Sequence, residues 1–375
     1  MAAVVRPPIA VRRAALDSDE IGAIADALRT SQDSGDRLVE ELERTFATAI
    51  GTRFAVAVSS ETTALHLSLV ANGVRPYDEV ITTAYAPPPS VHAIRLAGAR
   101  PIFVDIRDDT FTLDSSLIEE RITERTRAIL PVHLYGAPAD MHEILDVARR
   151  YDLRVIENAA HAQYAAIGGR LVGSFGTGCF TFDGDMPSSV VRGGIITTDS
   201  PVLDERLRLL RADGVRGGDD PEFYGHDCGV SEIQAAVGLV QTRSLRTRAE
   251  SRIEHAAYLA ARLPSVGTPV TLPEYRHVFH EFTIRVPHGR DVVARRLVEA
   301  GVGTSTLTSQ PLHRDAKVPD RRRLVPLPVS DRASRELLSL PVHAALTHED
   351  LDLVAERVAS VVARLAPQQF LRFTL

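Results

Sequence analysis

Ionisable side chains that can exchange protons follow several of the apolar runs in this sequence. Glu61, His161, Asp183 and Asp185 each stand within a few residues of the end of such a run. A histidine beside carboxylates can titrate near neutral pH, so this set predicts a site that abstracts and returns a proton. Structural roles remain open: His161 as a hydrogen-bonded core histidine, and the two aspartates as solvated loop residues.

The apolar runs that must position these side chains are short and alternate with amphipathic stretches. The runs occupy 55–60, 79–84, 100–106, 127–136 and 153–159, with amphipathic stretches at 63–71 and 141–151. This alternation predicts an α/β protein with an open, mostly parallel sheet. Ligands of such sheets bind beyond the carboxyl ends of the strands, so the residues that follow the runs are expected to converge.

Further polar side chains stand near the same strand ends. Tyr85, Asn158 and Arg192 are candidate hydrogen-bond donors to a substrate, and Asp227 adds a carboxylate. His133, in an HLYG segment, is more typical of a structural histidine. No HxH or HExxH spacing is present, so we expect no metal site.

The rest of the chain indicates a second, smaller lobe. After about residue 245 a long arginine-rich helical pattern continues to 263 and is followed by the apolar run 280–286 and a helical stretch at 291–301. We therefore divide the chain into a large domain at 1–245, which starts with an arm at about 1–15, and a small C-terminal α+β domain at 246–375.

Composition excludes several classes of function. The 375 residues carry a net charge of -6 that is spread along the chain, so nucleic acid is not an expected partner. Cys179 and Cys228 form no metal or disulfide pattern, which favours the cytoplasm. No apolar stretch reaches the roughly 18 residues that a membrane span needs, so a membrane is not expected either.

Ordered motifs over nearly the whole chain, from about Leu16 to Val362, resemble the DegT/DnrJ/StrS family of sugar aminotransferases. The resemblance implies the fold type I architecture, in which a mostly parallel seven-stranded sheet lies between helices. It also implies a homodimer with its active site at the subunit interface, pyridoxal phosphate (PLP) as cofactor, and a sugar-like, usually nucleotide-linked substrate. The motifs are VSSETTAL (58–65), TAYAPPPS (83–90), HLYGAPADM (133–141), VIENAAHA (155–162), GGRLVGSFG (168–176), CFTFDGDMPSSVVRGG (179–194), GHDCGVSEIQAA (225–236), PLH (311–313) and SLPVH (339–343).

The position that matches the family's cofactor-binding lysine is Met186, and a thioether cannot form an imine. The single lysine of the chain, Lys317, stands elsewhere, in a predicted loop. The acidic partner of the pyridine nitrogen corresponds to Asn158, and the neighbouring glutamine to His161. The aromatic residue that covers the ring corresponds to Pro87.

The matching phosphate-binding positions also differ. A glycine corresponds to Glu61, an asparagine of the second subunit corresponds to Asp227, and a serine is conservatively replaced by Thr181. Two carboxylates then face the place where a phosphate is expected, which weakens its binding. Each change alone has a structural interpretation, such as a helix cap at Glu61 or a filled apolar hole at Met186.

Three hypotheses follow for the function. The preferred one is a PLP-independent enzyme of a biosynthetic pathway that uses no cofactor and carries out a dehydration, epimerisation or cyclisation by proton transfer. In it Glu61, His161, Asp183 and Asp185 are catalytic, and the substrate contacts Tyr85, Asn158, Thr181, Met186, Arg192 and Asp227. The second is a dehydratase or aminotransferase that uses pyridoxamine phosphate (PMP) on a nucleotide sugar. The third is a non-catalytic partner subunit of an active aminotransferase.

Overall fold

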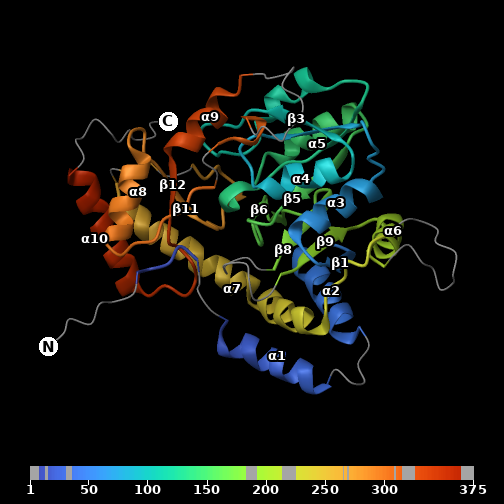
Figure 1. Cartoon of the computed structure of the whole chain (residues 1–375), viewed down its shortest axis with the longest axis horizontal. Coiled ribbons are helices and arrows are strands. Elements are labelled where there is room, and N and C mark those ends of the chain that lie inside the picture. Colours follow the sequence, from blue (N-terminus) through green and yellow to red (C-terminus); the bar gives the residue numbers. More distant parts are fainter. Residues whose placement is uncertain are drawn as a thin grey trace.

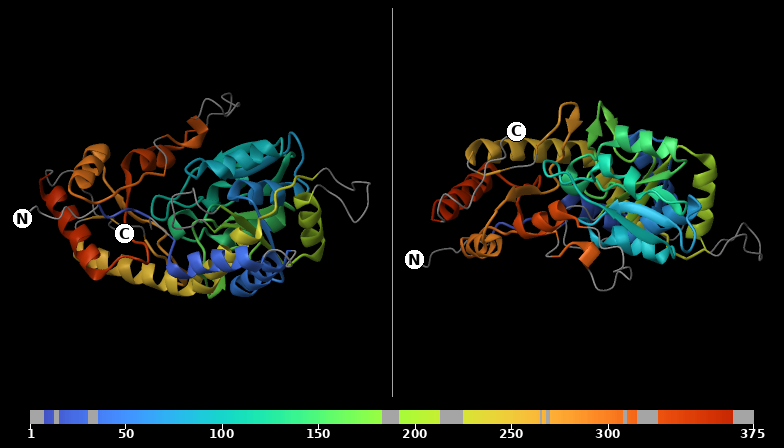
Figure 2. Two further views of the ribbon diagram at one scale, coloured as in Figure 1. Left: turned by 60° about the horizontal axis from the view of Figure 1, so that its bottom comes forward. Right: turned by 90° about the horizontal axis from the view of Figure 1, so that it is seen from above.

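The computed structural model describes residues 8–12, 16–30, 36–182, 192–212, 225–264, 266–267, 270–307, 310–314 and 326–364. Two lobes are joined by one long helix (Figures 1 and 2). Asp183, Asp185, Met186 and Lys317 lie outside the described residues.

The large lobe is built on a seven-stranded sheet in the order β1-β9-β8-β5-β4-β2-β3. Strands β2, β3, β4, β5 and β8 pair in parallel, and β9 runs antiparallel to both β1 and β8. This confirms the predicted fold class, and each predicted apolar run of the large lobe forms a strand. The strands are β1 (Phe54–Val58), β2 (Glu79–Thr83), β3 (Arg100–Val104), β4 (Thr126–Ile129), β5 (Arg154–Asn158), β8 (Thr177–Thr181) and β9 (Gly194–Thr198).

Helices cover both faces of this sheet, because its strands are apolar on both sides. On one face α3 (Glu61–Ala71), α4 (Pro88–Leu96) and α6 (Pro201–Arg211) share a core with Val56, Val80 and Ile156. On the other face α2 (Arg37–Ile50) and α5 (Met141–Arg150) pack on alternate side chains of the same strands. A small three-stranded sheet lies beside the large one and contains β6 (Ala166–Ile167), β7 (Arg170–Leu171) and β10 (Tyr275–Arg276).

Helix α7 (Glu232–Arg262) connects the lobes. It begins at a capping box in which Ser231 and Gln234 satisfy each other's backbone N–H groups. Its first half packs on α2 and on α1 (Ser18–Thr30), and its last turns enter the core of the small lobe. The predicted domain boundary after residue 245 falls inside this helix, so the division into two domains stays a prediction.

The small lobe surrounds the antiparallel pair β11 (Phe282–Arg285) and β12 (Leu337–Leu340). Helices α8 (Arg290–Glu299) and α10 (His348–Arg364) close its core, while α9 (Pro328–Glu336) packs back on the large lobe. The described part of the predicted N-terminal arm joins this lobe, because Ile9 forms a parallel bridge with Val302. No described helix is long and apolar enough to cross a membrane.

Candidate functional site

The N-terminus of α3 forms one wall of the site and is rich in hydroxyl groups. Ser60 caps the helix, and its Oγ accepts the N–H of Thr63 at 3.1 Å. The Thr63 Oγ1 also lies 2.9 Å from the Ser60 Oγ and 3.1 Å from the Ser59 Oγ. Helix N-termini carry a positive partial charge and spare N–H donors, so this turn suits an anionic group.

A carboxylate of the chain itself already lies at this helix end. The Asn158 Nδ2, at the end of β5, donates to the Glu61 Oε1 at 2.9 Å and to the Ser90 Oγ at 3.0 Å. The Asn158 Oδ1 accepts the N–H of Ala160 at 3.1 Å. The structure therefore brings together Glu61 and Asn158, as predicted, and adds Ser90 of α4, which the sequence analysis does not single out.

The neighbouring Glu157 points to the opposite side of the strand and has a structural role. Its two oxygens accept the N–H groups of Gly173, Phe175 and Gly176, each at 2.8 Å. The His133 Nε2 lies 3.1 Å from the same carboxylate, and its Nδ1 accepts the N–H of Ala139. Because both ring nitrogens of His133 bond within the core, the structural interpretation of this histidine is supported.

His161 lies against a histidine of the small lobe. Its ring stacks on His280 with centroids 4.4 Å apart and planes 9° apart. Within the described residues its Nδ1 is shielded from solvent and has no hydrogen-bond partner. Removal from water lowers the pKa of His161 to about 4, although Glu281 opposes the shift. A neutral imidazole therefore faces the site at physiological pH.

The remaining predicted residues are placed as follows. Tyr85 is buried, and its hydroxyl lies 2.7 Å from that of Tyr135. The Thr181 Oγ1 donates to the Gly193 carbonyl at 3.0 Å and is buried. Arg192 and Asp227 are exposed. The segment that holds Asp227 lies at the site, because the adjacent Cys228 carbonyl accepts the N–H of Ser59 at 2.8 Å.

Three residues of the site are missed by the sequence analysis: His280, Glu281 and Arg12. The Glu281 carboxylate accepts from the Arg12 guanidinium at 3.1 Å and from the Ser305 hydroxyl at 3.2 Å. Burial raises the pKa of Tyr85 and of Tyr135, and the Glu281 charge adds to both shifts. The sequence offers one sign of these residues, a histidine next to a glutamate just before a strand. Their partners, His161 and Arg12, are distant in sequence, so the contacts could not be predicted.

The fold and this strand-end site define an aminotransferase-type α/β protein, and comparison with known proteins specifies its family. The profile of the DegT/DnrJ/EryC1/StrS aminotransferase family matches residues 14–359, and the chain belongs to this family.

Similar proteins cover nearly the whole chain. GDP-perosamine synthase of Caulobacter vibrioides is 36% identical over 374 residues, which cover 95% of this chain and 99% of that protein. DesV of S. venezuelae, solved in complex with a ketimine intermediate, is 34% identical with a TM-score of 0.87, and the match covers 92% of this chain and 95% of DesV. The sugar aminotransferase Spr1654 of Streptococcus pneumoniae, in its PLP form, shares the fold at 24% identity, a TM-score of 0.87 and coverage of 96% and 100%.

These relatives contradict the predicted cofactor-free, PLP-independent enzyme. The family is an aminotransferase family, the relative that is 36% identical is a GDP-perosamine synthase, and DesV has been solved with a ketimine intermediate. The prediction is wrong because it takes the changes at Met186, Asn158, Pro87, Glu61 and Asp227 together as loss of the cofactor. A lysine supplies the imine, whereas a phosphate and a ring can also be held by hydrogen bonds and a helix end.

Proposed function

We propose that this chain modifies a sugar-like, nucleotide-linked substrate with PMP as a cofactor held without a covalent bond. The family and the whole-length likeness to GDP-perosamine synthase support the substrate class. The observation that carries the proposal is the hydroxyl-rich N-terminus of α3. The first residue of this helix, Glu61, accepts a hydrogen bond from the Asn158 amide, so the helix end and the end of β5 lie side by side.

The described residues fit the cofactor in its non-covalent form. Ser59, Ser60 and Thr63 offer hydroxyl groups for a phosphate, at a helix end that attracts anions. Both N–H groups of the Asn158 amide are engaged, with Glu61 and Ser90, so the amide donates to an unprotonated ring nitrogen only when one of these bonds is exchanged. Glu61 competes with a phosphate for the same helix end, so we expect a dissociable cofactor. The methionine at 186 agrees with this, because it forms no imine.

Bound PMP supplies a primary amine and an electron-accepting ring, which amination or deoxygenation of a keto sugar requires. His161 then holds and moves the proton. Its imidazole is neutral at pH 7, its Nδ1 lacks a partner among the described groups, and His280 fixes the plane of its ring. A base in this state can accept a proton without first losing one.

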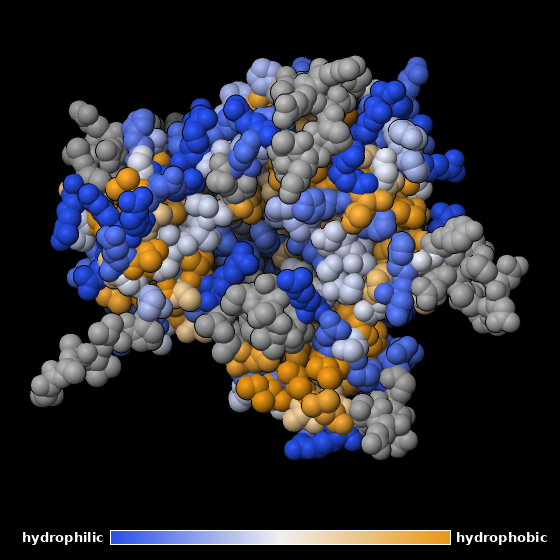
Figure 3. All heavy atoms as spheres, in the orientation of Figure 1, coloured by the Kyte–Doolittle hydropathy of each residue, from blue (hydrophilic) through white to orange (hydrophobic). Residues whose placement is uncertain are grey.

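The proposal extends to assembly and location. A homodimer with the site at its interface is supported by α1, whose Ile21 and Leu28 are 56% and 58% exposed. Figure 3 shows an apolar patch over this helix, at the bottom of the view. Exposed apolar patches of this kind mark association surfaces. The proposed location is the cytoplasm.

The test is turnover of a GDP-linked keto sugar by the purified chain in the presence of an amino-acid amine donor, with and without PMP. We expect conversion only with PMP, and a near-ultraviolet absorbance change when PMP binds. His161→Asn should lower kcat by roughly 10²- to 10⁴-fold, the usual contribution of a general base, and leave PMP affinity unchanged. His92→Asn, on the exposed face of α4, is the matched control.

Two outcomes would overturn the proposal. One is failure to bind PMP at all. The other is equal turnover by His161→Asn and His92→Asn, which would remove His161 from the proton transfer. If the chain is inactive but raises the activity of an aminotransferase added to the assay, it is a partner subunit instead.

A further inference from the structure

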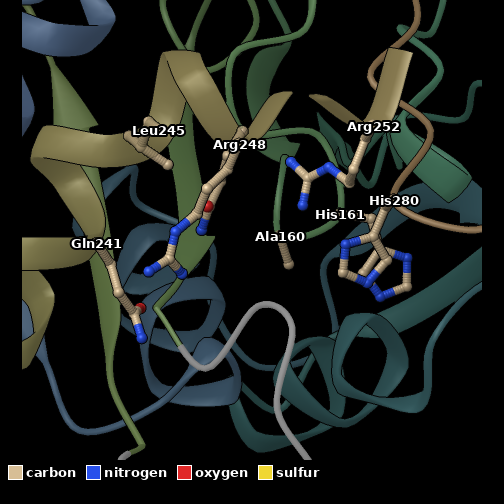
Figure 4. A pocket seen from close by; sticks show the side chains of 8 residues that line it. Ala160, His161, Gln241, Leu245, Arg248, Arg252 and His280 are labelled. Carbon is tan, nitrogen blue, oxygen red and sulfur yellow. The ribbon is translucent and has the colours of Figure 1, made fainter. Parts of the chain in front are cut away.

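A small polar cavity lies between α7 and the segment that follows β5 (Figure 4). Its volume is about 20 Å³. A cavity needs roughly 10–15 Å³ to hold one water, so this space takes one or two oxygen-sized groups and no sugar ring. Its polar lining consists of His161, Gln163, Gln241, Arg248, Arg252 and His280.

The two arginines of the lining project from one face of α7. Arg248 and Arg252 are four residues apart, so their side chains are neighbours on the helix surface. Figure 4 shows both guanidinium groups beneath α7, with the Arg252 group between Arg248 and the histidine rings. Arg252 is only 6% exposed. Asp17 and Glu20 balance the charge of Arg248, so the preference for a negatively charged guest comes from the buried Arg252 guanidinium.

Acidic groups at the start of α1 and in the residue before it hold Arg248 at one end. Its Nη2 donates to the Asp17 carboxylate at 3.2 Å and to the Glu20 carboxylate at 3.3 Å. A guanidinium has five N–H donors in a planar fork, so these contacts orient Arg248 and leave it further donor capacity. Among the residues that line the cavity, none is acidic.

The stacked histidines close the other end. Both rings are kept neutral: burial is the largest cause that lowers each pKa, and Arg12 adds to both shifts. Arg252 and the neighbouring His161 further lower the pKa of His280. Burial causes most of both shifts, and Glu281 opposes the shift of His161; an anion in the cavity would offset only the part that the arginines contribute. The His161 Nδ1, shielded and without a partner among the described groups, is available to such a guest.

A strained backbone holds His280 in this position. Tyr135 and Phe279 adopt φ values of 56° and 46°, which non-glycine residues rarely do. The two segments interlock, because the His280 N–H donates to the Tyr135 carbonyl at 2.9 Å and the Val278 N–H donates to the Gly136 carbonyl at 3.0 Å. A strained backbone is retained only where many surrounding contacts hold it in place, and such positions are concentrated at functional sites.

We propose that this cavity is a binding subsite for a small oxyanion, a carboxylate or phosphate group at the end of a substrate or cosubstrate. Arg248 and Arg252 bind its oxygens by charge-assisted hydrogen bonds. The Gln163 Nε2 already donates to the Thr181 carbonyl and the Gln241 Nε2 to Glu20 at 3.1 Å, so each amide has one further N–H for the guest.

The subsite goes beyond the proposed function and shares only the two stacked histidines, His161 and His280, with it. Gln241, Arg248 and Arg252 lie on α7, Gln163 follows β5, and none of these requires a cofactor. In this proposal the subsite binds the charged end of the substrate or cosubstrate, and the reacting part of that molecule extends toward Asn158.

The test uses the full chain without any pyridoxal compound, so that its result is independent of the proposed function. Succinate and inorganic phosphate are titrated separately near neutral pH by calorimetry. We expect saturable binding of at least one probe at one site per chain. The tighter probe identifies whether a carboxylate or a phosphate is the natural group.

Variants assign the binding to the cavity. Arg252→Gln and Arg248→Gln should each weaken binding roughly 10- to 100-fold, the loss expected for one charge-assisted contact. Arg246→Gln, on the exposed side of the same helix, should bind as the wild type does. Circular dichroism checks that each variant is folded, and Arg248→Gln decides the outcome if Arg252→Gln does not fold.

Absence of saturable binding by both probes would overturn the subsite. So would folded Arg248 and Arg252 variants that bind as tightly as Arg246→Gln. As an independent readout, the imidazole signals of His161 should shift to higher pKa when the probe is bound, and an unchanged titration curve would count against the proposal.

Discussion

At the residue scale, two consecutive side chains of strand β5, Glu157 and Asn158, have different roles: the first is structural and the second lies at the candidate site. Glu157 is buried among three backbone N–H groups and His133, and contributes to the core. Asn158 points to the other side and joins Glu61 at the end of α3. Because side chains alternate along a strand, a shift of one residue would exchange these roles.

Buried neutral histidines make the stability of the protein depend on pH. The pKa of His161 is lowered to about 4 and that of His277 to about 3, in both cases mainly by burial, and that of His280 is also lowered. The unfolded chain takes up protons near the ordinary histidine pKa of about 6.5, before the folded one does. We therefore expect the free energy of unfolding to fall as pH decreases from about 6.5 toward 4, by up to ~1.4 kcal/mol per pH unit for each histidine.

Urea unfolding at several pH values measures this slope. His277→Gln should reduce it by about 1.4 kcal/mol per pH unit, because glutamine does not titrate and its amide oxygen can accept the Phe279 N–H in place of the His277 Nδ1. The exposed His288→Gln is the matched control. A slope that is identical in the two variants would show that His277 is protonated alike in the folded and unfolded chain.

At the element scale, two short loops decide the geometry of the site. The HLYG turn after β4 and the segment before β11 come from different lobes and share backbone hydrogen bonds. Gly136 lies at φ +95°, and a Cβ there would meet the backbone nitrogens of His280 and Phe279 at 2.9 Å. This contact between the two lobes fixes the position of the His280 backbone, and with it the stacking of His280 on His161.

Gly136→Ala should therefore cost both backbone strain and steric overlap, together about 2 to 4 kcal/mol of unfolding free energy. Gly51→Ala is the control, because Gly51 has a similar φ of +83° with open space around it. It should cost only the strain, about 1 to 2 kcal/mol. Urea denaturation compares the two, and equal losses would mean that the loops move apart freely.

At the scale of the whole molecule, the lobes are joined by α7 and by ion pairs between them. Asp108 of the large lobe binds Arg285 at 2.6 Å and Arg332 at 2.9 Å. Helix α7 carries the two cavity arginines on one face and packs against α1 and α2 on another. Helix α1, which carries the exposed apolar surface, therefore packs on the helix that lines the cavity.

The proposed homodimer can be tested on that surface. The double change Ile21→Glu and Leu28→Glu should weaken self-association roughly tenfold or more, as loss of central apolar contacts usually does. Sedimentation equilibrium measures the dissociation constant. Val202→Glu on α6, 55% exposed before the change, is the control. A wild-type monomer at micromolar concentration, or equal dissociation constants for both variants, would contradict an interface at α1.

The sequence by itself determined the strands, their alternation with helices and the family, because apolar periodicity and ordered motifs are local properties of the chain. It also determined that Glu61 and Asn158 meet, since both follow strands that end at one edge of the sheet. Only the tertiary structure decided the surroundings of His161. His280 stacks on it through the packing of the small lobe, and Arg248 and Arg252 of α7 line the same cavity. Contacts between distant segments leave no pattern in a single sequence. The cofactor prediction failed for a related reason: side-chain identities at a few positions do not determine what a whole site binds.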